Sequence, residues 1–117
     1  MEKTIEIDGK QVRFKSTGAT PLRYKTQFGK DFFADLMKME SLTKLKKNKQ
    51  PTYKDLKDLD METFYNIVWV LAKTADKEIS EPIEWLDTFD EFPLFEVLPQ
   101  LQELMISSLK GKQSEKK

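Results

Sequence analysis

The sequence predicts an α+β fold, a mainly α-helical single domain with an N-terminal β-hairpin. Apolar and polar residues alternate on either side of Asp8-Gly9, which is typical of two strands joined by a tight turn. After residue 20, apolar residues recur three and four positions apart, as they do along the buried face of a helix. The length of 117 residues fits one domain. We therefore expect a globular domain over residues 1–110 with four to six helices, followed by a disordered polar tail over 111–117.

The hairpin is predicted over residues 4–16. Asp-Gly readily adopts the positive φ angles of a two-residue turn. Two strands alone are marginally stable in water, so this hairpin must pack against helices or pair with another strand edge. We favour packing on the chain's own core, and pairing with a partner remains the alternative. The residues expected on its apolar face are Ile5, Ile7, Val12 and Phe14.

The first helical segment is expected to begin at Thr20-Pro21, with Thr20 as the N-cap and the proline at the first helical position. Gly29 either lies inside one long helix or divides it in two. We favour a division, because glycine commonly ends helices and Asp31 can cap the next one. One face carries the stripe Tyr24, Phe28, Phe32, Leu36 and Met39, which Phe33 and Met37 widen.

Residues 44–57 hold six lysines and one acid, Asp55. The stretch has one aromatic residue, no arginine and no glycine-rich loop, so a polar connection between helices is a better interpretation than a nucleic-acid site. The helix that follows, capped by Asp58 or Asp60, is the clearest in the chain. It is apolar on most of its circumference and should lie in the middle of the fold, with Trp69 in the core. Its stripe consists of Met61, Phe64, Tyr65, Val68, Leu71, Ala72 and Ala75.

The stretch from Asp76 to Glu96 carries eight acidic residues and one lysine, with aromatic residues interleaved. Ser80 is expected to cap a short helix that begins at Glu81-Pro82. A last helix should begin near Phe92-Pro93, kink or restart at Pro99, and end at Gly111. Its stripe consists of Leu94, Leu98, Leu101, Met105 and Leu109, with Val97 and Leu104 alongside.

The composition excludes several kinds of chemistry. The chain has no Cys and no His, so it offers no disulfide, thiolate zinc site, cysteine nucleophile or triad base. Twenty basic and twenty acidic residues cancel, so no overall field attracts nucleic acid. No apolar run approaches the ~18 residues of a membrane span, and Met1-Glu2-Lys3 does not open a signal peptide. We expect a cytosolic, non-enzymatic protein without cofactors.

Only the acidic stretch could hold a metal or an acid–base pair. The spacing of Asp76, Glu78, Glu81, Glu84 and Asp87 lacks the glycine turn and terminal glutamate of a calcium-binding loop, so we predict no metal site. Aromatic residues surrounded by acids suit a surface that receives an amphipathic helix, although the same residues could simply complete the core. The predicted partner-binding residues are Trp85, Phe89, Phe92, Phe95 and Leu98, with Phe32, Phe33 and Met37 as a second candidate surface.

The chain as a whole resembles the tail assembly chaperones of long-tailed phages and prophages of Gram-positive bacteria. The resemblance covers roughly residues 4–109 and rests on the order of several blocks, of which the one at residues 21–32 is the most specific. The blocks are Ile5-x-Ile7-Asp8-Gly9-Lys10, Phe14-Lys15-Ser16-Thr17-Gly18-Ala19, Pro21-x-x-Tyr24-x-x-Gln27-Phe28-Gly29-Lys30-Asp31-Phe32, Tyr65-x-x-Val68-Trp69, Ala72-Lys73-x-Ala75-Asp76, Glu84-Trp85-Leu86, Phe89-x-x-Phe92 and Val97-Leu98-Pro99.

This resemblance implies a protein of the host cytoplasm that is not part of the mature virion. Members of the family coat the helical, aggregation-prone tape measure protein and help to recruit tail tube subunits. Many also occur in a longer form that arises by ribosomal frameshifting, and this chain is similar to the short form. Self-association along a long client is a further possibility, and the free hairpin edge would allow it.

Other function classes remain open from the sequence. The main alternative is a structural phage component, such as a head–tail joining or tail-completion protein. A small adaptor that binds one host protein is a third interpretation, and an enzyme is the last.

Overall fold

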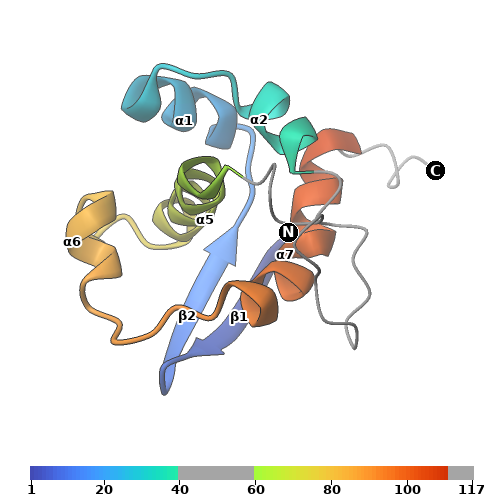
Figure 1. Ribbon diagram of the computed structural model, residues 1–117. Coiled ribbons are helices and arrows are strands. Elements are labelled where there is room, and N and C mark those ends of the chain that lie inside the picture. Colours follow the sequence, from blue (N-terminus) through green and yellow to red (C-terminus); the bar gives the residue numbers. More distant parts are fainter. Residues whose placement is uncertain (40–59, 111–117) are drawn as a thin grey trace.

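A two-stranded hairpin and five helices make up the part of the chain that the structure describes, residues 1–39 and 60–110 (Figure 1). The structure is a computed structural model, and for Phe95, Ile106, Ser108, Leu109 and Lys110 it describes the backbone alone. The predicted α+β class, with an N-terminal hairpin and a mainly helical remainder, is therefore confirmed. The lysine-rich connection over 44–57 and the polar tail over 111–117 lie outside the described residues.

The hairpin forms as predicted, with β1 at Glu2–Ile7 and β2 at Lys10–Lys15. Its strands are antiparallel and pair Ile5 with Val12. Asp8 and Gly9 join them with φ angles of 54° and 78°, the left-handed values that a tight two-residue turn requires. Ile5, Ile7 and Phe14 turn inward, so this sheet covers the protein's own core.

The chain divides at Gly29 into α1 (Thr20–Phe28) and α2 (Phe32–Lys38), as predicted. Gly29 has φ 70°, and its N–H bonds to the carbonyl of Lys25. Asp31 caps α2 by accepting the Ala34 N–H at 2.9 Å. The stripe along these helices is also confirmed, with Phe28 half-buried and the other four side chains buried. Phe33 and Met37 do not widen it, because they lie on the exposed side of α2.

The prediction that Thr20 caps α1 is wrong. Thr20 is the first residue of the helix, Ala19 occupies the N-cap position, and no side chain caps it. The physical reason is a turn just before the helix, in which the Thr17 hydroxyl accepts the Ala19 N–H at 3.2 Å. The Thr20 hydroxyl in turn accepts the Thr17 N–H and meets Thr74 in the interior.

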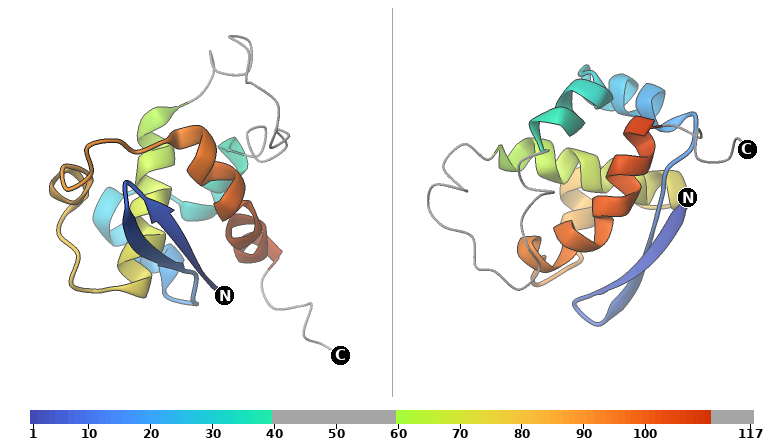
Figure 2. Two further views of the ribbon diagram at one scale, coloured as in Figure 1. Left: turned by 90° about the horizontal axis from the view of Figure 1, so that it is seen from below. Right: turned by 90° about the vertical axis from the view of Figure 1, so that its right-hand side faces the viewer.

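Helix α5 (Met61–Ala75) passes through the middle of the fold, as the views in Figures 1 and 2 show. It packs against β2 on one side and against α1 and α2 on another. Asp60 caps it through the Thr63 N–H, which confirms one of the two predicted caps, while Asp58 lies outside the described residues. Trp69 is buried, as predicted, but Met61 at the start of the stripe is 38% exposed.

The predicted cap of α6 (Pro82–Leu86) is wrong, because the N-cap is Glu81 and no side chain fills the role. Ser80 serves another purpose, since its carbonyl accepts the Trp69 Nε1–H at 2.9 Å. Helix α7 (Leu94–Lys110) continues through Pro99 without restarting. The predicted end at Gly111 lies outside the described residues.

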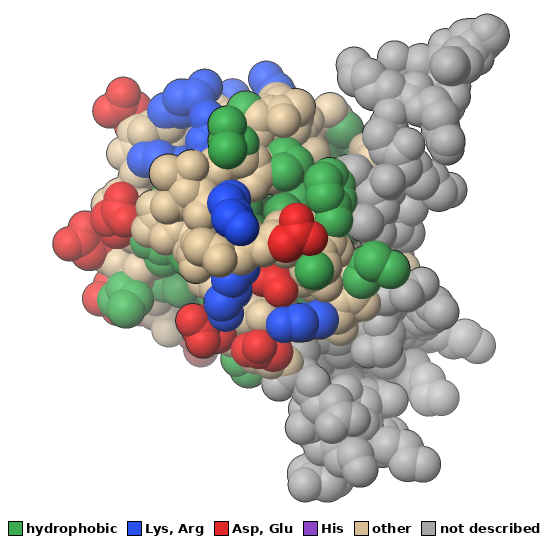
Figure 3. Space-filling view, turned by 90° about the horizontal axis from the view of Figure 1, so that it is seen from above, with side chains coloured by type: hydrophobic (Ala, Val, Ile, Leu, Met, Phe, Trp, Pro, Cys, Tyr) green, Lys and Arg blue, Asp and Glu red, His purple; other side chains and the backbone are tan. Residues whose placement is uncertain are grey.

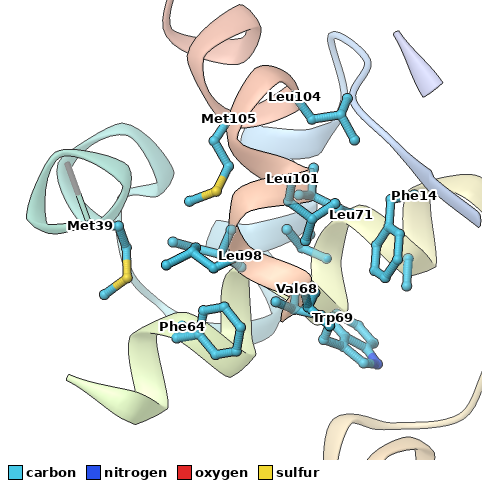
Figure 4. Packing of buried hydrophobic residues seen from close by; sticks show 14 of the residues in the cluster. Phe14, Met39, Phe64, Val68, Trp69, Leu71, Leu98, Leu101, Leu104 and Met105 are labelled. Carbon is cyan, nitrogen blue, oxygen red and sulfur yellow. The ribbon is translucent and has the colours of Figure 1, made fainter. Parts of the chain in front are cut away.

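The core lies where α7 meets α5 and β1. Figure 4 shows Leu98, Leu101 and Met105 of α7 pointing toward side chains of α5 and of the α2 end. All three are buried, and burying such a side chain contributes roughly 1.5–3 kcal/mol to folding. The labelled side chains that meet them are Met39, Phe64, Val68 and Leu71.

Candidate partner-binding surface

Three of the predicted partner-binding residues form one aromatic cluster between α6 and α7. The ring centroids of Trp85 and Phe89 lie 5.2 Å apart, and those of Phe89 and Phe92 lie 5.5 Å apart. Phe92 also contacts Tyr65 of α5 edge-on at 6.0 Å. Lys10 of the hairpin lies over the Phe89 ring, 5.1 Å from its centroid, and donates to the carbonyl of Thr88. The cluster therefore joins the hairpin, α5 and α6.

This cluster has little apolar area to offer a partner. Trp85, Phe89 and Leu98 are buried, Phe92 is half-buried, and the Phe95 side chain is not described. The described aromatic side chains of this stretch point toward the interior, and its acidic side chains point toward solvent. The eight acids that point outward are Asp76, Glu78, Glu81, Glu84, Asp87, Asp90, Glu91 and Glu96.

The second predicted surface, on α2, is more accessible. Phe32 is buried and packs edge-on against Tyr24, with 5.3 Å between the ring centroids. Phe33 and Met37 remain 40% and 61% exposed. They are four residues apart and so lie on one face of the helix. We call Phe33 and Met37 the α2 face; among the predicted partner-binding residues whose side chains the structure describes, these two are the most exposed.

Buried polar contacts hold α2 in place behind this face. The Tyr24 hydroxyl of α1 donates to Oδ2 of Asp35 at 2.6 Å, and Lys38 Nζ lies 3.4 Å from Oδ1. Burial raises the pKa of Tyr24 well above its ordinary value of 10.0, and the Asp35 hydrogen bond raises it further. The phenol is therefore protonated and able to donate at neutral pH. With Asp31 capping its start, α2 presents its exposed face from a fixed position.

The predicted partner-binding set did not include two exposed apolar residues, Leu22 on α1 and Ile83 on α6. They are 69% and 75% exposed. Each stands two positions before a buried aromatic residue, Tyr24 or Trp85. Two positions correspond to about 200° around a helix, so each points away from the core. That spacing is visible in the sequence and could have identified both.

A groove lies beside Leu22, between α1, the second half of α5 and the start of α6. Leu22 contributes exposed apolar surface, whereas Trp69 lines the groove but is only 2% exposed. Arg23 and Lys73 contribute positive charge, and Glu81 contributes one negative charge. We call it the α1–α5 groove. Its lining residues are Ala19, Leu22, Arg23, Thr26, Gln27, Trp69, Lys73 and Glu81.

The described residues 1–39 and 60–110 contain no group of three Asp, Glu, His or Cys side chains placed to hold a metal ion. Among the described helices, none is both long enough and apolar enough to span a membrane. A scan against protein-family models, a search of curated proteins and a search of solved structures all gave no match. The case for a function therefore rests on the residues themselves.

Proposed function

We propose that this protein is a phage tail assembly chaperone of the host cytoplasm, absent from the mature virion. It binds the tape measure protein, keeps that long helical client soluble, and helps to recruit tail tube subunits, without catalysis. The tail tube contact is assigned to a longer, frameshifted form of the chain. The support is the ordered set of sequence blocks that resembles this family, together with one structural observation, the α2 face.

The α2 face has the properties that such a client requires. A tape measure protein presents long amphipathic helices, and an aromatic and a thioether side chain on one helical face can pack against them. Methionine is flexible and polarizable, so it adapts to different apolar surfaces along one client. Because the Tyr24–Asp35 hydrogen bond anchors α2, binding does not first require ordering of the helix.

The proposal is tested by co-expressing the chain with the tape measure protein of the same phage. The wild-type chain should raise the soluble fraction of the client. The double variant Phe33→Glu, Met37→Lys should lose most of this effect, because it replaces both apolar side chains with charges. The variant preserves the net charge, and its charges suit the helix dipole, with the acid in the first turn and the base near the end.

The matched control is Met61→Glu, which charges a 38% exposed methionine at the first position of another helix. It should solubilise the client as well as the wild type does. If the folded double variant also keeps the client soluble, the α2 face is not the contact. If the wild-type chain itself does not raise the soluble fraction, the chaperone proposal fails. Detection of the chain in purified virions would favour a structural component instead.

A further inference from the structure

The α1–α5 groove combines apolar and positive character. Trp69 is buried beneath it, and Lys73 Nζ lies 5.9 Å from the centre of a Trp69 ring. The same Nζ donates to the carbonyls of Lys77 at 2.9 Å and Ile79 at 2.7 Å, which holds the lysine in place. Arg23 uses Nη1 to donate to the Thr74 hydroxyl at 3.2 Å. An arginine has five N–H donors, so a partner's carboxylate can still bond to this guanidinium.

Next to the α1–α5 groove, the same chain carries an exposed apolar residue flanked by acids. Ile83 is the most exposed large apolar side chain in the described residues, and the acids Glu81, Glu84 and Asp87 surround it in sequence. All three acids are exposed. We call these four residues the acidic ridge. In the view of Figure 3, Asp and Glu side chains gather along the left edge, the side on which α6 lies in Figure 1.

The ridge and the groove are held side by side. The Gln27 side chain of α1 donates to Glu81 Oε1 at 2.9 Å, so the residue that begins the ridge also lines the groove. Leu22, the second most exposed large apolar residue of the described chain, lies at the groove itself. The ridge is firmly anchored, because Trp69 donates to the Ser80 carbonyl and Trp85 is buried.

We propose that a second copy of this chain binds here, with the acidic ridge of each copy in the α1–α5 groove of the other. Ile83 packs against Leu22, and the acids Glu84 and Asp87 of the ridge face Arg23 and Lys73. Because ridge and groove are adjacent, one two-fold axis forms both contacts at once and the assembly closes as a dimer. An aliphatic residue among acids complements a groove that presents Leu22 beside two cations. The one acid that lines the groove, Glu81, is bonded to Gln27 of its own chain.

This interface differs from pairing through the hairpin edge. The hairpin already makes contacts within its own chain. Arg13 of β2 donates to the carbonyl of Ala75 at the end of α5 at 2.6 Å, and the Asp90 N–H donates to Asp8 in the hairpin turn at 2.9 Å. The inference also stands apart from the chaperone proposal, since it concerns the purified chain without a client.

The test is the mass of the purified chain by sedimentation velocity up to about 100 µM, where a dimer with Kd near 10 µM predominates. The wild type should approach twice the 13.8 kDa chain mass. In a dimer of Ile83→Arg or of Leu22→Glu the substitution alters both symmetric contacts. Each variant should therefore weaken the dimer about a hundredfold and stay mostly monomeric at about 100 µM. Both residues are largely exposed, so neither variant should unfold the chain. Phe33→Glu, on the α2 face, should leave the mass unchanged.

Mixing the two monomeric variants, Ile83→Arg and Leu22→Glu, gives the decisive result. A mixed dimer has two contacts. In one, the arginine introduced on the ridge of the first copy forms an ion pair with the glutamate introduced in the groove of the second copy. In the other contact, both the ridge and the groove are wild type. The mixture should therefore recover dimers, whereas each variant alone should not. A wild-type chain that stays monomeric at the highest concentration overturns the proposal. A dimer that survives either single variant, or a mixture that stays monomeric, overturns it as well.

Discussion

At the scale of single residues, the buried pair of Tyr24 and Asp35 shows how one polar contact joins two short helices. Both side chains are buried, and their hydrogen bond spans 2.6 Å. A buried carboxylate is costly unless it is paired, and here a phenol on α1 and Lys38 on α2 pair it. The α1–α2 connection therefore depends on a specific contact as well as on apolar packing.

The variant Tyr24→Phe tests that contact. It keeps the ring and removes the hydroxyl, so Oδ2 of Asp35 loses a buried donor. We expect the free energy of unfolding in urea to fall by about 1–3 kcal/mol. Tyr65→Phe is the matched control, because its ring is only half-buried, and it should change stability by less than about 0.5 kcal/mol. Equal stability of Tyr24→Phe and the wild type would mean that the hydrogen bond contributes nothing.

The same pair predicts an alkaline pH dependence. In the folded protein the pKa of Tyr24 is raised by burial, while in the unfolded chain it takes its ordinary value of 10.0. Above that pH the unfolded chain releases a proton that the folded protein keeps, so stability falls as pH rises. Urea midpoints measured from about pH 9 to 11 should decrease less steeply for Tyr24→Phe than for the wild type. Parallel curves would contradict the assignment.

At the scale of elements, short capping signals decide where the helices begin and end. Gly29 takes a φ of 70° and ends α1, Asp31 begins α2, and Asp60 begins α5. Thr20 and Ser80 are capping residue types in suitable positions, yet neither caps. Their polar groups are used instead for the contacts with Thr17 and Trp69. Long-range packing determines which of these local possibilities is realised.

The cap of α5 can be tested with a pair of substitutions. Asp60→Ala should destabilise the protein by about 1 kcal/mol, and Asp60→Asn by much less, because asparagine still accepts the Thr63 N–H. Hydrogen bonds from the Thr63 side chain and backbone lower the pKa of Asp60 below its ordinary 3.8. This stabilisation is present above pH 3.8 and is lost as the pH falls below it. Asp60→Asn should lose that part of the acid dependence in urea unfolding, and an unchanged acid dependence would contradict the cap.

At the scale of the whole molecule, α5 joins the hairpin, α1, α2 and α6 into one core. The two tryptophans report on different parts of it. Trp69 lies on α5, whereas Trp85 lies on the five-residue helix α6, and both are buried. Trp85 contacts Phe89 and Phe92 edge-on, which connects α6 to the segment leading into α7.

We therefore expect a single cooperative unfolding transition. Urea curves followed by far-ultraviolet circular dichroism and by tryptophan fluorescence should coincide. The variants Trp69→Phe and Trp85→Phe, which leave one tryptophan each, separate the two reporters. In Trp69→Phe, the fluorescence comes from Trp85. If it changes at a lower urea concentration than the circular dichroism signal of the helices, the α6 region unfolds independently of the core.

Much of this fold could be predicted because it follows from local rules. The alternation around Asp8-Gly9 predicted the hairpin, Gly29 the division between α1 and α2, and the all-round apolar pattern of residues 61–75 the central helix. The position of Trp69 in the core was also predicted. These features depend on the spacing of apolar residues and on the φ angles that particular residues prefer, and both are properties of the sequence.

The candidate surfaces were harder to predict. For the aromatic residues of the acidic stretch, the sequence left open a partner-binding surface or the core. In the structure Trp85 and Phe89 are buried, and the acids of the stretch are exposed. On α2 the opposite happened, since Phe33 and Met37 were expected to widen the buried stripe and are exposed. Phe32 and Phe33 are identical side chains in adjacent positions, and only the direction from which α1 and α5 approach α2 buries one of them.

By itself, the sequence determined the α+β class, the turn, the helix division and the central helix, because hydrophobic periodicity and turn chemistry act over a few residues. Only the tertiary structure decided which of two adjacent apolar residues, such as Phe32 and Phe33, faces solvent. It placed Leu22 of α1 and Glu81 at the start of α6 beside one groove and joined Tyr24 to Asp35. Burial depends on which elements pack together, and that packing brings together residues from segments far apart in the chain.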